Sequence, residues 1–390
     1  MYLKQNINRL YIIKIAKWFM LTMPILMIFY VQMGFSAHES FILKSCYSIA
    51  IVLFEIPSGY IADRWGRRNT LIIGSILGTL GFVIYSLFSG FYPFVIAELT
   101  LGIGMSFISG ADSAMLYDTL KANGQEREYV KYEGWNFSVG NFSEAIAGAI
   151  GGALAVASIH YPFYAQTLIA FTAVPAAFGL VEPPVVKQVG AKYMNIIDVL
   201  KHCLIANRAL RWNIVYSSVL GCATLSMAWV YPLKLSDLGY NEFEIGTTHT
   251  FLNLLLGAVT LVSYKIERFL GPKVTVWIST LTLTSAFILA GVSSEYWLLA
   301  VLTMFYFCRA IATPVLKDYV NRMTSSDIRA TVLSVRSLII RGLFVLVGPF
   351  FGFLTDDLGL NIAFVLLGAT FMVVTLSGIS LYLKALRQMK

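Results

Sequence analysis

The stretch GYIADRWGRR, residues 59–68, lies between two long apolar runs of the sequence. Within ten positions it holds two glycines and four charged residues, Asp63, Arg64, Arg67 and Arg68. A charged side chain at the centre of a bilayer costs roughly 2.5–3.5 kcal/mol, so charges gather where a chain leaves the membrane. The stretch therefore predicts a short polar loop between two membrane-spanning helices.

The composition places the whole chain in the same class. Of 390 residues, 57% are hydrophobic and only 13% are charged, and the mean hydropathy is +0.72. Soluble domains carry about 25% charged residues, so the sequence predicts an integral membrane protein. The four cysteines are scattered through apolar runs without metal-ligand spacing. We expect no bound metal, no cofactor and no catalytic residues.

Twelve apolar runs reach the length of about 20 residues that a helix needs to cross the hydrocarbon core. The predicted fold is all-α, a polytopic membrane protein with two pseudo-symmetric bundles of six helices. A polar joint starting at EPPVVKQVGAKY (182–193) separates them. We expect an N-terminal bundle over 1–182, a cytoplasmic linker over 183–207 and a C-terminal bundle over 208–390. The predicted spans are 13–34, 40–61, 69–89, 92–116, 132–157, 161–181, 209–233, 243–263, 274–293, 296–317, 330–353 and 361–384.

The basic residues predict the orientation of the chain. With a cytoplasmic N-terminus, roughly 24 of the 29 lysines and arginines fall on the inner side, as cytoplasmic loops require. This bias accounts for the net charge of +8 without a nucleic-acid partner. We expect a multi-pass protein of the cytoplasmic (inner) membrane, surrounded by lipid bilayer, with both termini cytoplasmic. The predicted outer segments hold mostly acids, namely Glu39, Asp237, Glu242, Glu244, Glu295, Asp356 and Asp357.

Weak internal similarity relates the two halves at an offset of about 200 residues. LYD at 116–118 matches LKD at 316–318, and YKIERFLGPK at 264–273 echoes the opening loop. Two related halves are a transporter design, with the substrate held between them near the midplane. At the same offset, Gly148 and Gly152 match Gly348 and Gly352.

The loop GYIADRWGRR resembles the loop between helices 2 and 3 of the major facilitator superfamily. The preceding EIPSG (55–59) is similar to the drug–proton antiporter branches, and RATVLSV (329–335) and GPFFGFLTDDLG (348–359) resemble helix 11 of the family. The resemblance covers the whole chain and implies a monomeric transporter of a small molecule. One departure is that the glycine–proline pair of the antiporter signature is missing from helix 5, and Gly348–Pro349 stands on helix 11 instead.

The charged loop is predicted to form an inner latch that holds one conformation. Its glycines permit tight turns and close helix approach, and a carboxylate is stabilised at a helix N-terminus. The family-implied partner of Asp63 is the start of helix 11, near 325–326, while Arg67 and Arg68 can bridge to acids at the inner end of helix 4. The alternative is that the arginines only set topology. The predicted latch residues are Gly59, Asp63, Arg64, Gly66, Arg67, Arg68 and Asp118.

Three acids inside predicted spans are candidates for proton coupling: Glu144, Asp112 and Glu98. A buried carboxyl group can load and release a proton near neutral pH. Glu144 lies on a stripe of helix 5 that recurs every four residues and suits close helix packing. The alternative for Glu144 and Asp112 is a permanent ion pair with an arginine. The stripe consists of Asn136, Gly140, Glu144, Gly148 and Gly152.

A second group is expected to face the substrate route. At the 200-residue offset, Asn136 and Asn141 correspond to Arg336 and Arg341, so the same faces are polar in both halves. Arg341 is the first candidate, with an ion pair to Glu144 or Asp112 as the alternative, and Arg336 is placed nearer the inner latch. Aromatic residues could line the cavity or simply face lipid. The candidates are Arg341, Arg309, Asn141, Arg336, His249, Tyr216, Trp229 and Tyr306, with Tyr231, Phe107 and Phe142 in the same aromatic group.

These features favour proton-coupled efflux of amphipathic small molecules by rocker-switch alternating access, with protons and the substrate as partners. The alternative is an importer or facilitator of an anionic metabolite, a siderophore or a lipid-like solute, for which the arginines would offer a cationic surface. An enzyme or receptor is not expected, because the sequence shows no phosphate loop, metal cluster or nucleophile–base pair.

Overall fold

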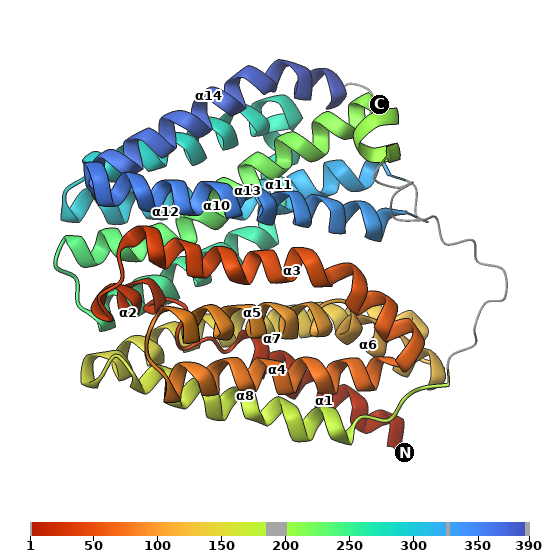
Figure 1. Ribbon diagram of the computed structural model, residues 1–390. Helices are drawn as coiled ribbons and strands as arrows, with labels where there is room; N and C mark the ends of the chain where they lie inside the picture. The colour runs from red at the N-terminus through yellow and green to blue at the C-terminus, as the bar shows by residue number, and fades with distance from the viewer. Residues whose placement is uncertain (1, 185–200, 325–327, 387–390) are drawn as a thin grey trace. The chain divides into compact units, whose positions relative to one another are not determined.

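The computed structural model describes residues 2–184, 201–324 and 328–386, and within these ranges the chain is helical without a β-strand (Figure 1). Nine helical segments of this described part are long and apolar enough to cross a membrane. An all-α membrane fold is therefore confirmed, whereas the count of twelve spans stays a prediction.

The chain divides into two compact units, which are described separately. The first comprises Met1–Gln188 and Gly239–Asn253, and the second Val189–Leu238 and Leu254–Lys390. The expected bundle and linker boundaries stay predictions. The helices are α1 (Tyr2–Trp18), α2 (Leu26–Gln32), α3 (Ala37–Trp65), α4 (Arg67–Leu87), α5 (Phe91–Ile108), α6 (Ala111–Ala122), α7 (Tyr129–Ala157), α8 (Tyr161–Gly179), α10 (Arg208–Asp237), α11 (Glu242–Val292), α12 (Glu295–Arg322), α13 (Arg329–Leu358) and α14 (Leu360–Leu386), with short turns η1 (Glu126–Glu128) and η2 (His202–Ala206).

The first predicted span, 13–34, is not one helix, since the chain leaves the helical path between α1 and α2. Pro24 lies in this break, and proline has no N–H to donate to a helix. The buried Gln166 of α8 accepts a hydrogen bond from the Leu21 N–H at 2.8 Å. Broken helices are tolerated at membrane depth where neighbouring side chains satisfy the freed backbone in this way.

The predicted span 92–116 is also divided. α5 ends before Gly110, whose φ of +82° favours glycine, and α6 then begins a new helix. The break matters for the site because it puts Asp112 in the first turn of α6.

The predicted spans 243–263 and 274–293 both lie in α11, a helical segment of 51 residues. It is kinked at Gly271, where the backbone is not helical. At 1.5 Å per residue its length is more than twice the roughly 30 Å of a hydrocarbon core. Gly271 has φ 76° and ψ 159°, close to the φ 94° and ψ 151° of Gly66. The two glycines paired by the sequence repeat thus take the same conformation in both halves of the chain.

Each unit has its own apolar core. In the first unit, α1, α6 and α8 pack around buried residues such as Met115 and Ala177. In the second, α10 is the most deeply buried candidate membrane helix of the described part, and its Leu210 and Ile214 pack with Val320 and Val332.

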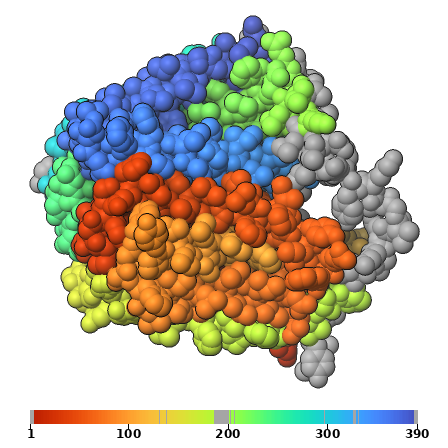
Figure 2. Space-filling view, in the orientation of Figure 1, coloured from red at the N-terminus to blue at the C-terminus, as the bar shows by residue number. Residues whose placement is uncertain are grey.

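Apolar side chains also cover the outer surface of the first unit. Figure 2 shows this surface formed by α3, α4 and α5, with α8 along its edge. Exposed apolar surface of this extent marks a place where a protein contacts a membrane or another protein. Examples are Leu53, Leu87, Ile96 and Leu168.

Candidate functional site

The charged loop of residues 59–68 turns sharply at its second glycine. The positive φ of Gly66 ends α3 and lets α4 begin at the next residue. This turn directs the Arg67 guanidinium to the Asp118 carboxylate of α6, and the same group donates to the Ala114 carbonyl at 2.5 Å. The structure thus brings three of the predicted latch residues together within the first unit.

Glu182 anchors this loop, although the sequence did not predict it as a site residue. Its two carboxylate oxygens accept hydrogen bonds from the backbone N–H groups of Arg67 and Arg68 at 2.8 and 2.7 Å. The first N–H groups of a helix have no partner within it, and a negative charge there is stabilised by the helix dipole. The Arg68 guanidinium also donates to the Phe178 carbonyl at 2.9 Å. The available signal was an acid directly after the sixth apolar run.

The remaining predicted latch residues, Gly59, Asp63 and Arg64, do not take part in the contact between Arg67 and Asp118. Asp63 is exposed and, with Gly59, lines a pocket of about 150 Å³, while Arg64 donates to the Tyr60 hydroxyl at 3.0 Å. No described atom lies within 4 Å of a Cβ built on Gly59, so the close helix approach expected there is not made. The expected partner at 325–326 lies outside the described residues, and the latch function stays a prediction.

Replacing Glu182 with glutamine should weaken the start of α4. The amide keeps one acceptor but loses the charge facing the helix dipole, so we expect the free energy of unfolding to fall by about 0.5–1 kcal/mol. Denaturant unfolding in detergent measures this change. Asp357→Asn, an exposed carboxylate on α13, serves as the control, and equal effects of the two substitutions would contradict the capping role.

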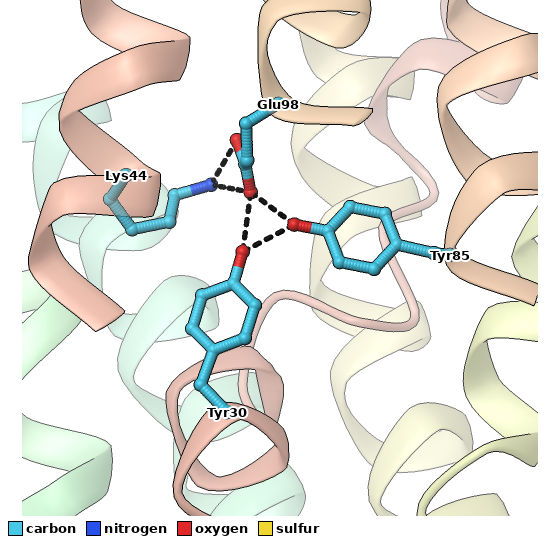
Figure 3. Close-up of polar contacts among 4 residues, drawn as sticks. All are labelled: Tyr30, Lys44, Tyr85 and Glu98. Atoms are coloured by element: carbon cyan, nitrogen blue, oxygen red, sulfur yellow. Dashed lines mark hydrogen bonds and ion pairs between the residues drawn. The ribbon is translucent and has the colours of Figure 1, made fainter. Parts of the chain in front are cut away.

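A buried charge network occupies the first unit where α2, α3, α4 and α5 meet (Figure 3). Glu98 of α5 is completely buried. The Lys44 ammonium donates to its two oxygens at 2.9 and 3.0 Å. The hydroxyls of Tyr30 and Tyr85 each donate to Glu98 Oε1 at 2.7 Å and contact one another. All four side chains converge on one point, as Figure 3 shows.

This network compensates two charges that would otherwise be very costly away from water. Glu98 is one of the three acids predicted for proton coupling, and that role stays a prediction. The sequence did not predict Lys44, Tyr30 or Tyr85 as its partners. Lys44 and Glu98 are 54 positions apart, so no helical periodicity could relate them.

Asp112 lies between two lysines of α1. Its Oδ2 is 3.8 Å from Lys14 Nζ and 3.6 Å from Lys17 Nζ, and its Oδ1 accepts the Ser113 N–H at 2.9 Å. The sequence predicts an arginine as the alternative partner of Asp112. The observed ion pairs of Asp112 are with lysines, because the break at Gly110 turns α6 toward α1.

Glu144 of α7 lies beside His249 of α11, within the first unit. Glu144 Oε1 is 3.8 Å from His249 Nε2, and the same ring nitrogen is 2.8 Å from the Asn253 amide nitrogen. The histidine side chain is 4% exposed and the glutamate 19%. One nitrogen of a titratable ring therefore faces both an amide donor and a carboxylate.

The small residues of the α7 stripe allow these helices to meet. A Cβ built on Gly152 would lie 2.5 Å from the Glu242 carbonyl oxygen and 3.0 Å from Gly246 Cα. One built on Gly148 would lie 3.0 Å from His249 Cδ2. All three distances are shorter than ordinary contacts, so the glycines permit the close packing of α7 on the start of α11.

The arginine candidates lie in the second unit. Arg336 donates from Nε to the Ser217 hydroxyl of α10 at 2.9 Å, and from Nη2 to its carbonyl at 3.3 Å. These bonds place Arg336 against α10 in the second unit. The Arg309 guanidinium lies 5.2 Å from the Tyr306 ring centroid, in cation–π range. Arg341 is half-buried on α13.

The aromatic candidates are mostly core residues of the second unit. Tyr216 stacks on Tyr382 with ring centroids 4.2 Å apart and shares a 2.5 Å hydrogen bond with Thr280. Tyr306 packs edge-on against Tyr231. Of the other candidates, Trp229 and Phe107 are buried, Asn141 is half-buried and Phe142 is exposed.

Within residues 2–184, 201–324 and 328–386, no group of three or more histidine, cysteine, aspartate or glutamate side chains could hold a metal ion. All four cysteines are free thiols.

The chain is similar in sequence to a known protein family and to individual members of it. The family model of the Major Facilitator Superfamily matches residues 10–268. The class B tetracycline resistance protein of Escherichia coli is 25% identical over 73% of this chain and 71% of its own length. Multidrug resistance protein 2 of Bacillus subtilis (strain 168) is 23% identical over 90% of this chain and 88% of its own length.

Solved structures share the fold at low sequence identity. The nucleoside transporter NupG aligns with a TM-score of 0.80 at 16% identity, covering 98% of this chain and 99% of its own. A POT family transporter in complex with a thioalcohol-conjugated peptide aligns with a TM-score of 0.75 at 15% identity, covering 99% and 100%.

Proposed function

The chain belongs to the Major Facilitator Superfamily and is a multi-pass membrane transporter rather than an enzyme, and from this premise we propose that it exports amphipathic small molecules in exchange for protons. Transport by alternating access requires two conformations separated by a few kcal/mol. The contacts of Arg67 with Asp118, and of Glu182 with the start of α4, are our candidates for holding one of them.

The names of the relatives support efflux. A tetracycline resistance protein and a multidrug resistance protein both match across most of this chain. At 25% and 23% identity they suggest a class of substrate, which we take to be amphipathic and ring-containing.

The three candidate carboxylates differ in their partners, and we choose the coupling residue on this difference. Glu98 and Asp112 form ion pairs with lysines. Glu144 faces His249, and an unperturbed histidine titrates at about pH 6.5. We therefore choose Glu144, with His249 beside it, as the proton-coupling site.

The main support for the proposal is the Nε2 atom of His249, which lies near both the Asn253 amide and the Glu144 carboxylate. When Nε2 is unprotonated it accepts a hydrogen bond from the Asn253 amide, which lies 2.8 Å away. When Nε2 is protonated it can no longer accept, and it becomes a donor to the Glu144 carboxylate, 3.8 Å away. Protonation thus exchanges a contact within α11 for a contact between α11 and α7.

Flux in proteoliposomes tests this function. Purified protein is reconstituted with an imposed pH gradient, and movement of tetracycline and of ethidium is followed together with internal pH. We expect either compound to move in the direction opposite to the flow of protons. An uncoupler, which dissipates the proton gradient, should stop this movement. The glutamine in Glu144→Gln cannot ionise, so the variant should reduce gradient-driven flux at least tenfold. Losing a general acid or base typically lowers a rate by more than this factor.

The matched control is Asp357→Asn, which makes the same chemical change at an exposed position and should transport as the unmodified protein does. Flux of both compounds that ignores the uncoupler would contradict proton exchange. Gradient-driven flux that survives Glu144→Gln would remove Glu144 from the mechanism.

A further inference from the structure

The sequence repeat places a second copy of the charged loop in α11 of the second unit, and the two copies make different contacts. The second copy, YKIERFLGPK (264–273), turns at Gly271. In the first unit the loop is joined to α6 by the contact of Arg67 with Asp118. The position that corresponds to Arg67 holds Pro272, which has no charge. The second copy therefore cannot make the contact that holds the first.

The acids beside the second copy have partners inside the second unit. Glu267 Oε1 accepts a hydrogen bond from the Tyr319 hydroxyl of α12 at 2.7 Å. Asp318, which matches Asp118 in the repeat, lies 2.7 Å from the Arg322 side chain one turn further along α12. These contacts leave the cations of the second copy without either acid.

Three cations consequently remain on the surface at this turn: Lys265, Arg268 and Lys273 are all exposed. None of them lies within 4 Å of an acidic group among the residues that the structure describes. The Lys265 ammonium lies 5.9 Å from the centroid of the Tyr264 ring, which is itself exposed. Three unpaired cations on one turn give this surface a positive potential.

Apolar side chains surround these cations. Phe269 is 89% exposed, and Leu261, one helical turn before Lys265, is 77% exposed. Beyond the turn, Val274 and Ile278 are four positions apart and form a second exposed apolar face. Cations directly beside exposed apolar side chains are typical of the level at which acyl chains meet headgroups.

We propose that this turn of α11 binds the headgroup of an anionic phospholipid. We name the surface the α11 turn patch, and it consists of Tyr264, Lys265, Arg268, Phe269 and Lys273. Its cations attract the lipid phosphate, and its aromatic rings suit the interface between headgroups and acyl chains.

The exposed apolar side chains on both arms of the turn favour a lipid over a soluble anion or an acidic protein. Acyl chains cover such side chains, whereas a small soluble anion leaves them exposed to water. The inference goes beyond the proposed function, because it depends neither on the direction of transport nor on Glu144.

Lipid binding to the purified full chain in detergent, followed by native mass spectrometry, tests the inference. Phosphatidylglycerol is compared with phosphatidylcholine of the same acyl chains, which carries no net charge. We expect phosphatidylglycerol to bind more tightly. Lys265→Gln, Arg268→Gln and Lys273→Gln should each weaken its binding about fivefold, and the three together about a hundredfold, without changing the binding of phosphatidylcholine.

Two further variants separate the patch from net charge alone. Lys121→Gln, Lys317→Gln and Lys384→Gln, combined, remove the same charge from exposed positions elsewhere and should leave the binding of phosphatidylglycerol unchanged. Phe269→Ala removes an apolar contact that both lipids share, so it should weaken the binding of both by about tenfold. All the substituted side chains are exposed, and unfolding midpoints in detergent check that each variant is folded.

Equal binding of the two lipids to the unmodified chain would overturn the inference. The same conclusion follows if the control triple variant loses as much binding as the patch triple variant. Glycerol 1-phosphate or polyglutamate that displaces phosphatidylglycerol at the concentration where the lipid itself binds would identify a soluble anion or an acidic protein instead.

The outcomes for lipid binding and for transport can be distinguished. Proton-driven flux without selective binding of phosphatidylglycerol would contradict only the lipid site. Selective binding that depends on Lys265, Arg268 and Lys273, without proton-driven flux, would contradict only the proposed function.

Discussion

Lys44→Met should destabilise the protein by about 3–5 kcal/mol, because it leaves the fully buried Glu98 carboxylate without its cation. The Tyr30 and Tyr85 hydroxyls remain as donors, but hydrogen bonds do not neutralise the charge. Removing both charges together, in Lys44→Met with Glu98→Gln, should recover most of this loss. Denaturant unfolding in detergent of both single variants and the double variant measures the coupling between them.

An exposed ion pair of the same first unit provides the control. Lys131 and Glu128 are 3.7 Å apart with side chains 55% and 42% exposed, so Lys131→Met should cost less than about 1 kcal/mol. The network would lose its assigned role if Lys44→Met cost no more than Lys131→Met. It would also lose that role if the double variant were as unstable as the sum of the singles.

Gly152→Ala should destabilise the first unit by about 1–3 kcal/mol, because its methyl group has no space. The neighbouring atoms are the Glu242 carbonyl oxygen at 2.5 Å and Gly246 Cα at 3.0 Å. Both belong to backbone, which cannot rotate away as a flexible side chain can. The start of α11 must then separate from α7, and this movement also disturbs the Glu144–His249 contact.

The same helix supplies the matched control. Gly134 of α7 has no neighbour within 4 Å of a built Cβ, and alanine favours a helix interior over glycine by about 0.5–1 kcal/mol. Gly134→Ala should therefore be neutral or stabilising. The unfolding midpoints of the two variants, compared in one detergent, measure the difference. Equal midpoints would mean that Gly152 is not a point of close approach.

Several local features could be predicted because the responsible residues are close in sequence. The turn at Gly66 follows from glycine within a short charged loop, and the echo at Gly271 follows from the repeat. The break near Pro24 was missed, although proline inside an apolar run is a signal for one. The break at Gly110 was missed because a glycine inside a helical pattern is often tolerated.

The candidate site was predicted only in part. Glu144, His249 and Asp112 were singled out because charge inside an apolar run is costly and needs a reason. Their partners could not be foreseen, since Glu144 and His249 lie in different halves of the sequence. Lys14, Lys17 and Glu182 were not predicted as site residues.

A membrane protein built of long helices can be predicted from the amino-acid sequence alone, because the thickness of the hydrocarbon core sets the length of an apolar run whatever its neighbours are. The partners of the buried charges, as with Lys44 and Glu98 or Asp112 and the lysines of α1, are visible only in the folded chain. A buried charge is stabilised by the groups within a few ångströms of it, and the packing of helices from distant parts of the chain fixes which groups these are.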